Sequence, residues 1–230
     1  MGWPMVKKNK QLLTQACVKF FSGVAIVMLL VFLPAGTIRF AQGWLLMSVL
    51  FVPMFAAGLV MWRKAPDLLK SRLQAKEKEG EQRQVIAFSG AMFLIGFILC
   101  GLRFRWGWSG IPLWGSLCAA AVFLVGYSLF GLVLHQNAYL SRTIEVQSGQ
   151  KVIDTGLYGL VRHPMYTATI LMFLSMPLIL GSWQAFPVFL LYLPIIVKRI
   201  RNEEVVLKRE LAGYENYCNR LKWRLIPYIW

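Results

Sequence analysis

Residues 156–166 of this 230-residue chain place Arg162, His163 and Tyr166 directly before a long apolar run. Ionisable side chains at the edge of a membrane are costly to bury unless they line a cavity or a ligand path. Pro164 suits the first position of a helix, and a helix N-terminus favours a carboxylate or a phosphate. We therefore predict that Arg162 and His163 bind the anionic part of a ligand, with Tyr166 one turn further in. The plainer alternative is a helix start with an interfacial arginine.

Arg199, Glu203 and Glu204 form a second polar cluster, directly after the next apolar run. Arg199 and Glu203 are four residues apart, so they would share one face of a helix. Taken alone, such a pair is typical of an exposed salt bridge of small energy. Two carboxylates directly after a membrane helix, however, carry a burial cost unless a cation compensates it. We predict that they hold the cationic part of the same ligand.

The bulk composition predicts an all-α, polytopic helical membrane protein. Hydrophobic residues make up 57% of the chain, the mean hydropathy is +0.55, and only 15% of the residues are charged. A soluble domain carries roughly a quarter charged residues. The apolar residues form blocks that approach the ~20 residues needed to span hydrocarbon. The predicted spans number about six, at residues 18–38, 44–62, 85–102, 111–135, 165–181 and 184–198.

The basic residues fall in alternate connections between these spans. With Lys19 left aside, 21 Lys and Arg lie on one side, including Lys7, Lys8 and Lys10, and only Arg39, Arg103 and Arg105 lie on the other. Basic residues favour the cytoplasmic side. We therefore expect a multi-pass protein of the bacterial inner membrane with both termini in the cytoplasm. The net charge of +15 then reflects topology, and nucleic acid is not an expected partner.

Metal and disulfide chemistry are not expected either. The four cysteines include no CxxC pair, and His135 and His163 are the two histidines of the chain. A structural zinc site needs about four close ligands. His135 ends the fourth apolar segment, where a lone histidine is more typical of a helix end than of a ligand.

The chain divides into two predicted parts. Residues 1–135 would hold the N-terminal transmembrane helices, and residues 136–230 would hold a cofactor-binding loop, a transmembrane helical hairpin and a C-terminal catalytic tail. Pro177, Pro187 and Pro194 interrupt the hairpin and could leave a groove between its helices. The residues predict a cytoplasmic-facing pocket for a mixed-charge ligand beside an apolar groove, while their spacing leaves the reaction open.

At these residues the chain resembles the isoprenylcysteine carboxyl methyltransferase and phospholipid methyltransferase superfamily of integral membrane enzymes. The resemblance covers about residues 150–230 and is carried by Val152–Tyr158, Val161–Tyr166, Glu203-Glu204 and Arg224–Pro227. One position departs from the pattern: the superfamily usually has glycine shortly after the Arg-His-Pro-x-Tyr motif, and here Thr167 follows it directly.

The resemblance implies an enzyme that uses S-adenosylmethionine to methylate a lipophilic acceptor at the cytoplasmic membrane face. The acceptor would be isoprenylcysteine-carboxylate-like or phospholipid-like. Arg199 and Glu203 would be the catalytic residues, with Arg199 facing the acceptor. The implied cofactor-binding residues are Gln150, Val152, Tyr158, Arg162, His163, Tyr166, Glu203 and Glu204. The donor's sulfonium and ammonium suit the two carboxylates, and its own carboxylate suits Arg162 and His163.

Two alternatives stay open. A membrane NADPH-dependent reductase of the sterol-reductase type has a similar C-terminal region with a related Arg-His-Pro-x-Tyr motif, although those enzymes are larger and have more spans. A non-catalytic lipid-binding membrane protein would bind no small cofactor. All three hypotheses share a lipophilic small molecule and membrane lipids as partners.

Overall fold

The structure is a computed structural model that describes residues 3–73, 80–137, 139, 146–147 and 149–230, with backbone only at residues 3–10, 71 and 80–83. The predicted cytoplasmic side chains of Lys7, Lys8 and Lys10 therefore lie outside the described part.

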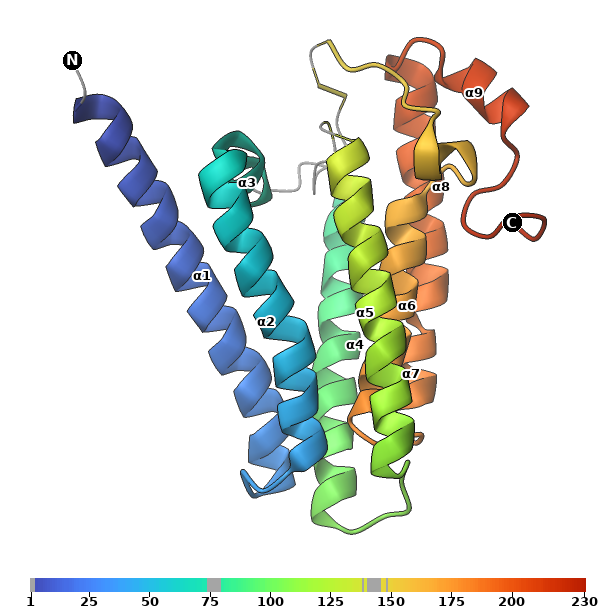
Figure 1. The fold of residues 1–230 in the computed structure, drawn as a ribbon. Helices are drawn as coiled ribbons and strands as arrows, with labels where there is room; N and C mark the ends of the chain where they lie inside the picture. The colour runs from blue at the N-terminus through green and yellow to red at the C-terminus, as the bar shows by residue number, and fades with distance from the viewer. Residues whose placement is uncertain (1–2, 74–79, 138, 140–145, 148) are drawn as a thin grey trace.

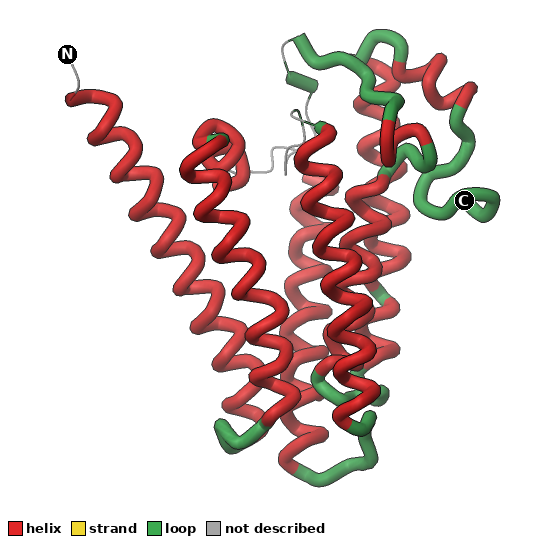
Figure 2. Tube along the Cα trace, in the orientation of Figure 1, coloured by secondary structure: helices red, strands yellow, loops and turns green. Residues whose placement is uncertain are grey.

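The described residues fold into helices and connections without a strand, as Figure 2 shows. The long helices run up and down in turn, so both the start of α1 and the C-terminal segment lie toward the same end of the bundle (Figure 1). The helices are α1 (Trp3–Ala35), α2 (Ala41–Lys64), α3 (Pro66–Leu73), α4 (Gly80–Arg105), α5 (Leu113–Gln136), the 3₁₀ turn η1 (Gly156–Gly159), α6 (Pro164–Ile179), α7 (Phe186–Leu190), α8 (Tyr192–Glu210) and α9 (Tyr214–Arg220).

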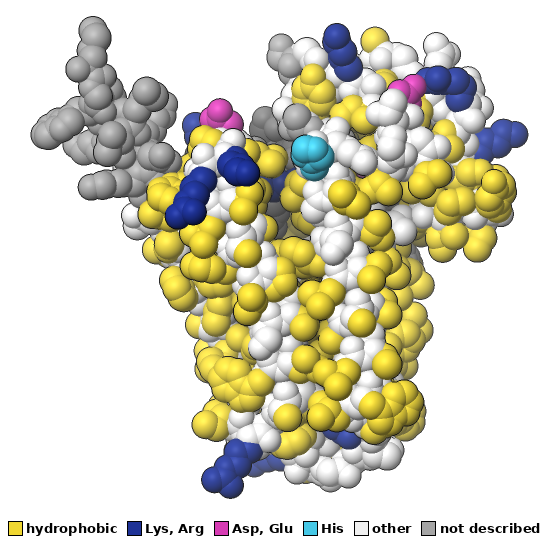
Figure 3. All heavy atoms as spheres, viewed as in Figure 1, with side chains coloured by type: hydrophobic (Ala, Val, Ile, Leu, Met, Phe, Trp, Pro, Cys, Tyr) yellow, Lys and Arg dark blue, Asp and Glu magenta, His cyan; other side chains and the backbone are white. Residues whose placement is uncertain are grey.

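Four helices confirm the prediction of a polytopic helical membrane protein. Helices α1, α2, α4 and α5 contain apolar stretches of 22 to 25 residues, long enough to cross a membrane. Their outer faces carry large apolar side chains such as Leu33, Val52 and Trp114, which are 72%, 67% and 71% exposed. Hydrophobic atoms accordingly cover the waist of the molecule in Figure 3. Lipid is the environment in which such a surface is stable.

The last two predicted segments differ in length from the prediction. Helix α6 has 16 residues, and the segment predicted at 184–198 is broken into α7 and the start of α8. The break has a covalent cause, because Pro194 has no N–H for the carbonyl of Leu190 and its ring clashes with that carbonyl. A second proline of the hairpin, Pro177, lies two residues before the end of α6. The hairpin is therefore shorter than a regular pair of spans.

Small residues let the long helices approach closely. A Cβ added to Gly101 of α4 would lie 2.7 Å from the carbonyl oxygen of Val31 in α1. A Cβ added to Gly126 of α5 would lie 3.0 Å from the carbonyl oxygen of Ala168 in α6. Close backbone packing of this kind is the usual source of helix association in lipid. The α5–α6 contact places the N-terminus of α6 beside the C-terminus of α5, where the polar residues lie.

The two ends of the bundle should label from opposite sides of the membrane. In a variant without the four native cysteines, Glu215→Cys lies at the end that contains α9, and Ser109→Cys lies in the α4–α5 connection at the other end; both residues are exposed. The charge asymmetry predicts that a membrane-impermeant maleimide reaches Ser109→Cys in intact cells and Glu215→Cys only after permeabilisation. The reverse pattern would contradict the predicted orientation.

Candidate functional site

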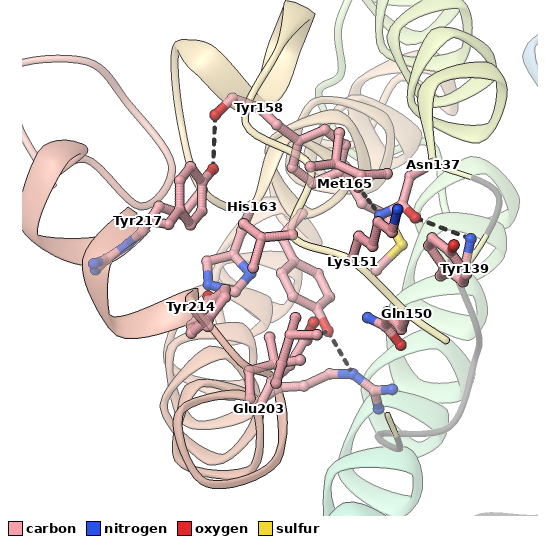
Figure 4. A pocket seen from close by; sticks show the side chains of 17 residues that line it. Asn137, Tyr139, Gln150, Lys151, Tyr158, His163, Met165, Glu203, Tyr214 and Tyr217 are labelled. Carbon is pink, nitrogen blue, oxygen red and sulfur yellow. Dashed lines mark hydrogen bonds between the residues drawn. The ribbon is translucent and has the colours of Figure 1, made fainter. Parts of the chain in front are cut away.

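A pocket opens at the end of the bundle where α5, α6, α8 and α9 meet. In Figure 4, Gln150, Lys151 and Tyr139 lie on one side of it, opposite His163, Tyr214 and Glu203. The full lining is Asn137, Tyr139, Gln150, Lys151, Val152, Ile153, Tyr158, Arg162, His163, Met165, Tyr166, Arg199, Glu203, Leu207, Leu211, Tyr214 and Tyr217. The two polar clusters, far apart in sequence, therefore meet at one site.

The structure brings together all but one of the residues predicted for the site. Arg199 and Glu203 line the pocket, and so do the predicted binding residues Gln150, Val152, Tyr158, Arg162, His163 and Tyr166. Glu204 does not line it. Glu203 and Glu204 are neighbours on α8, and successive helical residues point about 100° apart. One carboxylate therefore faces the pocket and the other faces the protein interior.

Arg199, Tyr166 and Glu203 form a hydrogen-bonded chain at the pocket wall. Arg199 Nε donates to the Tyr166 hydroxyl over 3.0 Å, and the Tyr166 hydroxyl donates to the Glu203 carboxylate. Tyr166 is buried in the first turn of α6. One phenol is thus held between a cation that stabilises negative charge on its oxygen and a base that accepts its proton.

Glu204 is the centre of a buried ionic cluster that also contains Arg162, His163 and Arg224. Its Oε1 lies 3.0 Å from a terminal guanidinium nitrogen of Arg162 and 3.2 Å from His163 Nε2. Its Oε2 accepts a hydrogen bond of 3.0 Å from Arg224 Nε and lies 3.0 Å from a terminal guanidinium nitrogen of the same residue. Burial alone would raise the pKa of Glu204, but the hydrogen bond and charge of His163, the charge of Arg162 and the Arg224 hydrogen bond hold it at about 2. The carboxylate therefore stays ionised and joins three segments.

The C-terminal tail completes the site by pairing with the entrance to α6. The backbone N–H groups of Arg162 and His163 donate to the carbonyls of Trp223 and Arg224, each over 2.9 Å. Thr167, at the position where the resemblance predicts glycine nearby, donates its hydroxyl to the Leu225 carbonyl over 2.8 Å. The departure from the pattern thus supplies one more bond between α6 and the tail.

Tyr158 connects the pocket wall to α5 and α9. Asn137 Nδ2 donates to its hydroxyl over 2.8 Å, and Tyr217 donates its own hydroxyl to the Tyr158 carbonyl over 2.7 Å (Figure 4). Burial raises the pKa of Tyr158 to about 12, with the Asn137 hydrogen bond acting in the other direction. The phenol is therefore neutral at physiological pH and can donate or accept a hydrogen bond.

Two buried donors at the pocket have no hydrogen-bond partner among the described residues. They are Arg162 Nε and the Tyr214 hydroxyl. An unpaired buried donor costs about 1–3 kcal/mol, so a ligand that supplies an acceptor to either one would recover that energy. Within the same part of the chain, no group of three His, Cys, Asp or Glu side chains is arranged to hold a metal. The pocket is suited to a ligand with acceptor oxygens.

Sequence reasoning missed several lining residues. Lys151 adjoins Gln150 and was passed over within the predicted loop. Asn137 follows α5, while Tyr214 and Tyr217 are three apart on α9 and so share a face. That spacing of two tyrosines in a basic tail was the available signal, but it fits packing against the membrane equally well. Arg224 of the ionic cluster gave no signal beyond its place in the closing motif.

Replacing Glu204 with glutamine should destabilise the fold strongly, because Arg162 would keep its charge in a buried position without its carboxylate partner. We expect a loss of about 3–5 kcal/mol in the free energy of unfolding, measured by denaturation in detergent. Glu210→Gln on the same helix is the control; Glu210 pairs with its neighbour Arg209 at the surface, and its loss should be within about 1 kcal/mol. Equal effects of the two substitutions would contradict the role of Glu204.

The same cluster predicts a pH dependence. The pKa of Glu204 is lowered from 4.5 to about 2 on folding, so its stabilisation is complete above the unfolded pKa and is lost as the pH falls from 4.5 toward 2. The loss should be on the order of 3 kcal/mol. Glu204→Gln should lack this component, and a wild-type curve as flat as that of the variant would refute it.

Comparison with known proteins points to one family. The family model described as the Ergosterol biosynthesis ERG4/ERG24 family matches residues 116–230. The Delta(14)-sterol reductase TM7SF2 of Mus musculus is 28% identical over 135 residues, covering 53% of this chain and 32% of the relative. The Delta(14)-sterol reductase of Methylotuvimicrobium alcaliphilum is 23% identical over 135 residues, covering 52% of this chain and 32% of the relative. The chain thus spans about a third of the length of these relatives.

Among solved structures, the eukaryotic intramembrane Ras methyltransferase ICMT, an isoprenylcysteine carboxyl methyltransferase, is 18% identical with a TM-score of 0.49. The match covers 94% of this chain and 86% of the other. A likeness this weak does not bear on activity.

These findings correct the predicted activity. The matching family is described by ergosterol biosynthesis, and both relatives are Delta(14)-sterol reductases by name. The predicted S-adenosylmethionine-dependent methyl transfer, with its donor and its methyl acceptors, is therefore wrong. The error has a physical origin: charged side chains around a pocket indicate what charge a ligand could carry, but they do not indicate the reaction. The smaller number of predicted spans was also a poor argument against the sterol-reductase alternative. The family match covers residues 116–230 and does not depend on how many spans precede them. The chain belongs to the ergosterol biosynthesis ERG4/ERG24 family.

Proposed function

We propose that this protein is a membrane reductase that uses NADPH to reduce a carbon–carbon double bond of a sterol-like lipophilic substrate. The observation that carries the proposal is that the family match, residues 116–230, contains every residue that lines the pocket, from Asn137 to Tyr217. Both relatives are Delta(14)-sterol reductases by name. The pocket, the polar clusters and the family assignment thus fall on the same half of the chain.

The residues of the pocket fit an anionic dinucleotide. Lys151, Arg162 and Arg199 bring three cationic side chains to the lining, and Glu203 is the one carboxylate among the described lining residues. Arg162 Nε and the Tyr214 hydroxyl supply two unpaired buried donors, which suit phosphate or carboxamide oxygens. The cavity has a volume of about 100 Å³, below the roughly 300–1,000 Å³ of a typical ligand site. It would therefore enclose one end of a dinucleotide and leave the remainder outside.

Reduction of a double bond needs a hydride and a proton, and a side chain of this protein can donate the proton. NADPH, when bound, would supply the hydride. The Tyr166 hydroxyl is the proton donor that the geometry favours, since Arg199 Nε donates to its oxygen over 3.0 Å. That hydrogen bond would stabilise the phenolate formed when the proton leaves. Glu203, which accepts the hydrogen bond of Tyr166, holds the proton in place before transfer and orients the ring.

An apolar wall is available for the substrate. Val152, Met165, Leu207 and Leu211 line the same pocket, and the site adjoins helices whose outer faces are apolar. Burial of a polycyclic hydrocarbon gains roughly 25 cal/mol per Å² of apolar surface. A lipophilic substrate is therefore consistent with the lining, as well as with entry from the bilayer.

Cofactor binding tests the proposal directly. Isothermal titration of the detergent-solubilised protein should detect NADPH and no heat from S-adenosylmethionine. Lys151→Gln should weaken NADPH binding roughly tenfold, because it removes one cation from the pocket. Lys222→Gln, at an exposed position of the tail, is the control with the same charge change and should bind as the wild type does. Absence of NADPH binding by a folded protein would refute the proposal, and so would equal effects of the two variants.

The proton role of Tyr166 predicts a separation of binding from turnover. Tyr166→Phe should lower NADPH-dependent reduction of a sterol diene by a factor of roughly 100 or more, which is typical for loss of a general acid, while the Kd for NADPH changes little. Tyr228→Phe removes a hydroxyl from a side chain that is 85% exposed and should leave turnover unchanged. Wild-type turnover in Tyr166→Phe would exclude this residue as the proton donor.

A further inference from the structure

A second cavity lies at the end of the bundle opposite the pocket. Its volume is about 470 Å³, and it is more open to the surroundings than the pocket at the other end. The start of α2, the end of α4 and the start of α5 form its walls, and its polar lining residues include Arg39, Gln42 and Arg103. Gln42 Nε2 donates to the Ile111 carbonyl over 3.0 Å and to the Ser116 hydroxyl over 2.7 Å. These bonds fix one wall of the cavity to the start of α5.

The charge at this end is positive and has no acidic counterpart. Arg39, Arg103 and Arg105 lie here, and the connecting residues 36–41, 105–113 and 180–186 contain no Asp or Glu. On the face shown in Figure 3, the lower end carries basic atoms and no acidic ones. Arg103 Nε is buried and has no hydrogen-bond partner among the described residues. A partly buried guanidinium without an anion is costly, so the site lacks a negative group.

Two helix N-termini add to the positive potential. Helices α2 and α5 both begin at the cavity, with Ala41 and Leu113 among its lining residues. Neither helix has a side-chain cap or an acidic residue in its first turn. The first N–H groups of a helix lack intrahelical acceptors and favour an anion. The N-terminal amides of α2 and α5 and the buried Nε of Arg103, which has no partner among the described residues, thus lie around one cavity.

The guanidinium of Arg103 lies against Gly110 among apolar side chains. A Cβ on Gly110 would lie 1.5 Å from a terminal nitrogen of Arg103, so a larger residue there requires the guanidinium to move. Phe40, Phe104 and Trp108 also line the cavity, and Trp114 in the first turn of α5 is 71% exposed. Aromatic residues of this kind mark the membrane–water interface.

We propose that this cavity binds the headgroup phosphate of an anionic phospholipid. A lipid headgroup and a free phosphate would be bound by the same chemistry. In both, a phosphate oxygen would accept hydrogen bonds from Arg103, Arg39 and the first amides of α2 and α5. A membrane lipid is favoured over a free phosphate because the cationic cavity opens onto apolar, aromatic surface at the level of the interface, where acyl chains would be buried. The site is independent of the proposed reductase activity and lies at the other end of the molecule.

Lipid-dependent thermal stability in detergent tests the proposal. The probes are a short-chain phosphatidylglycerol, the phosphatidylcholine of equal chain length, and inorganic phosphate. We expect phosphatidylglycerol to raise the Tm in a saturable manner, and the other two to have little effect at the same concentration. Arg103→Gln should weaken the apparent phosphatidylglycerol affinity roughly tenfold or more, as expected for loss of a charge-assisted hydrogen bond.

Two further variants separate a built site from general charge. Gly110→Ala keeps every charge but displaces the Arg103 guanidinium, and should weaken the lipid effect too. Arg63→Gln removes one positive charge from the last turn of α2, at the opposite end, and should respond as the wild type does. Equal stabilisation by phosphatidylcholine would overturn the proposal, and so would an equal effect of inorganic phosphate or a loss in Arg63→Gln as large as that in Arg103→Gln.

Discussion

The buried carboxylate of Glu204 is the interaction on which the rest of the site depends. It joins α8 to the entrance of α6 through Arg162 and His163, and to the C-terminal tail through Arg224. Because all three partners are cationic or can become so, the cluster holds together only while Glu204 is ionised. The backbone bonds from Arg162 and His163 to the tail then set the position of α6, and with it that of Tyr166. The pocket is thus assembled around a charge that does not itself face the ligand.

Adjacent positions on α8 consequently divide two tasks. Glu203 faces the pocket and accepts the hydrogen bond of Tyr166, whereas Glu204 is structural. This division gives the pocket a defined geometry: the groups proposed for chemistry line the pocket, and the carboxylate that orients the entrance to α6 lies in the protein interior. Stability and chemistry can therefore be altered separately by substituting one carboxylate or the other.

The sequence predicted the class of fold, and it singled out about half of the residues that line the pocket, for reasons that are local. Apolar blocks of span length identify α1, α2, α4 and α5. Pro164, which suits the first position of a helix, identifies the start of α6. The division at residue 135 and the orientation in the membrane stay predictions. Sequence could not resolve the hairpin, where Pro194 breaks a helix that hydropathy alone would continue. It also could not separate Glu203 from Glu204, because only the packing of α8 decides which one turns inward. The reaction was out of reach, since similar ionic clusters serve different chemistries.

The described acidic and histidine side chains lie at one end of the bundle, and this affects how the protein responds to a pH difference across the membrane. Every described Asp, Glu and His lies toward the pocket end, from Asp67 on α3 and His135 on α5 to Glu215 on α9. The opposite end carries arginines, which keep their charge at any physiological pH. Acidification of the compartment beyond that end therefore leaves the charge state of the described residues unchanged. Among the described residues, the groups that titrate near physiological pH are thus confined to one end of the bundle, and acidity at the other end would leave the charges of the site unchanged.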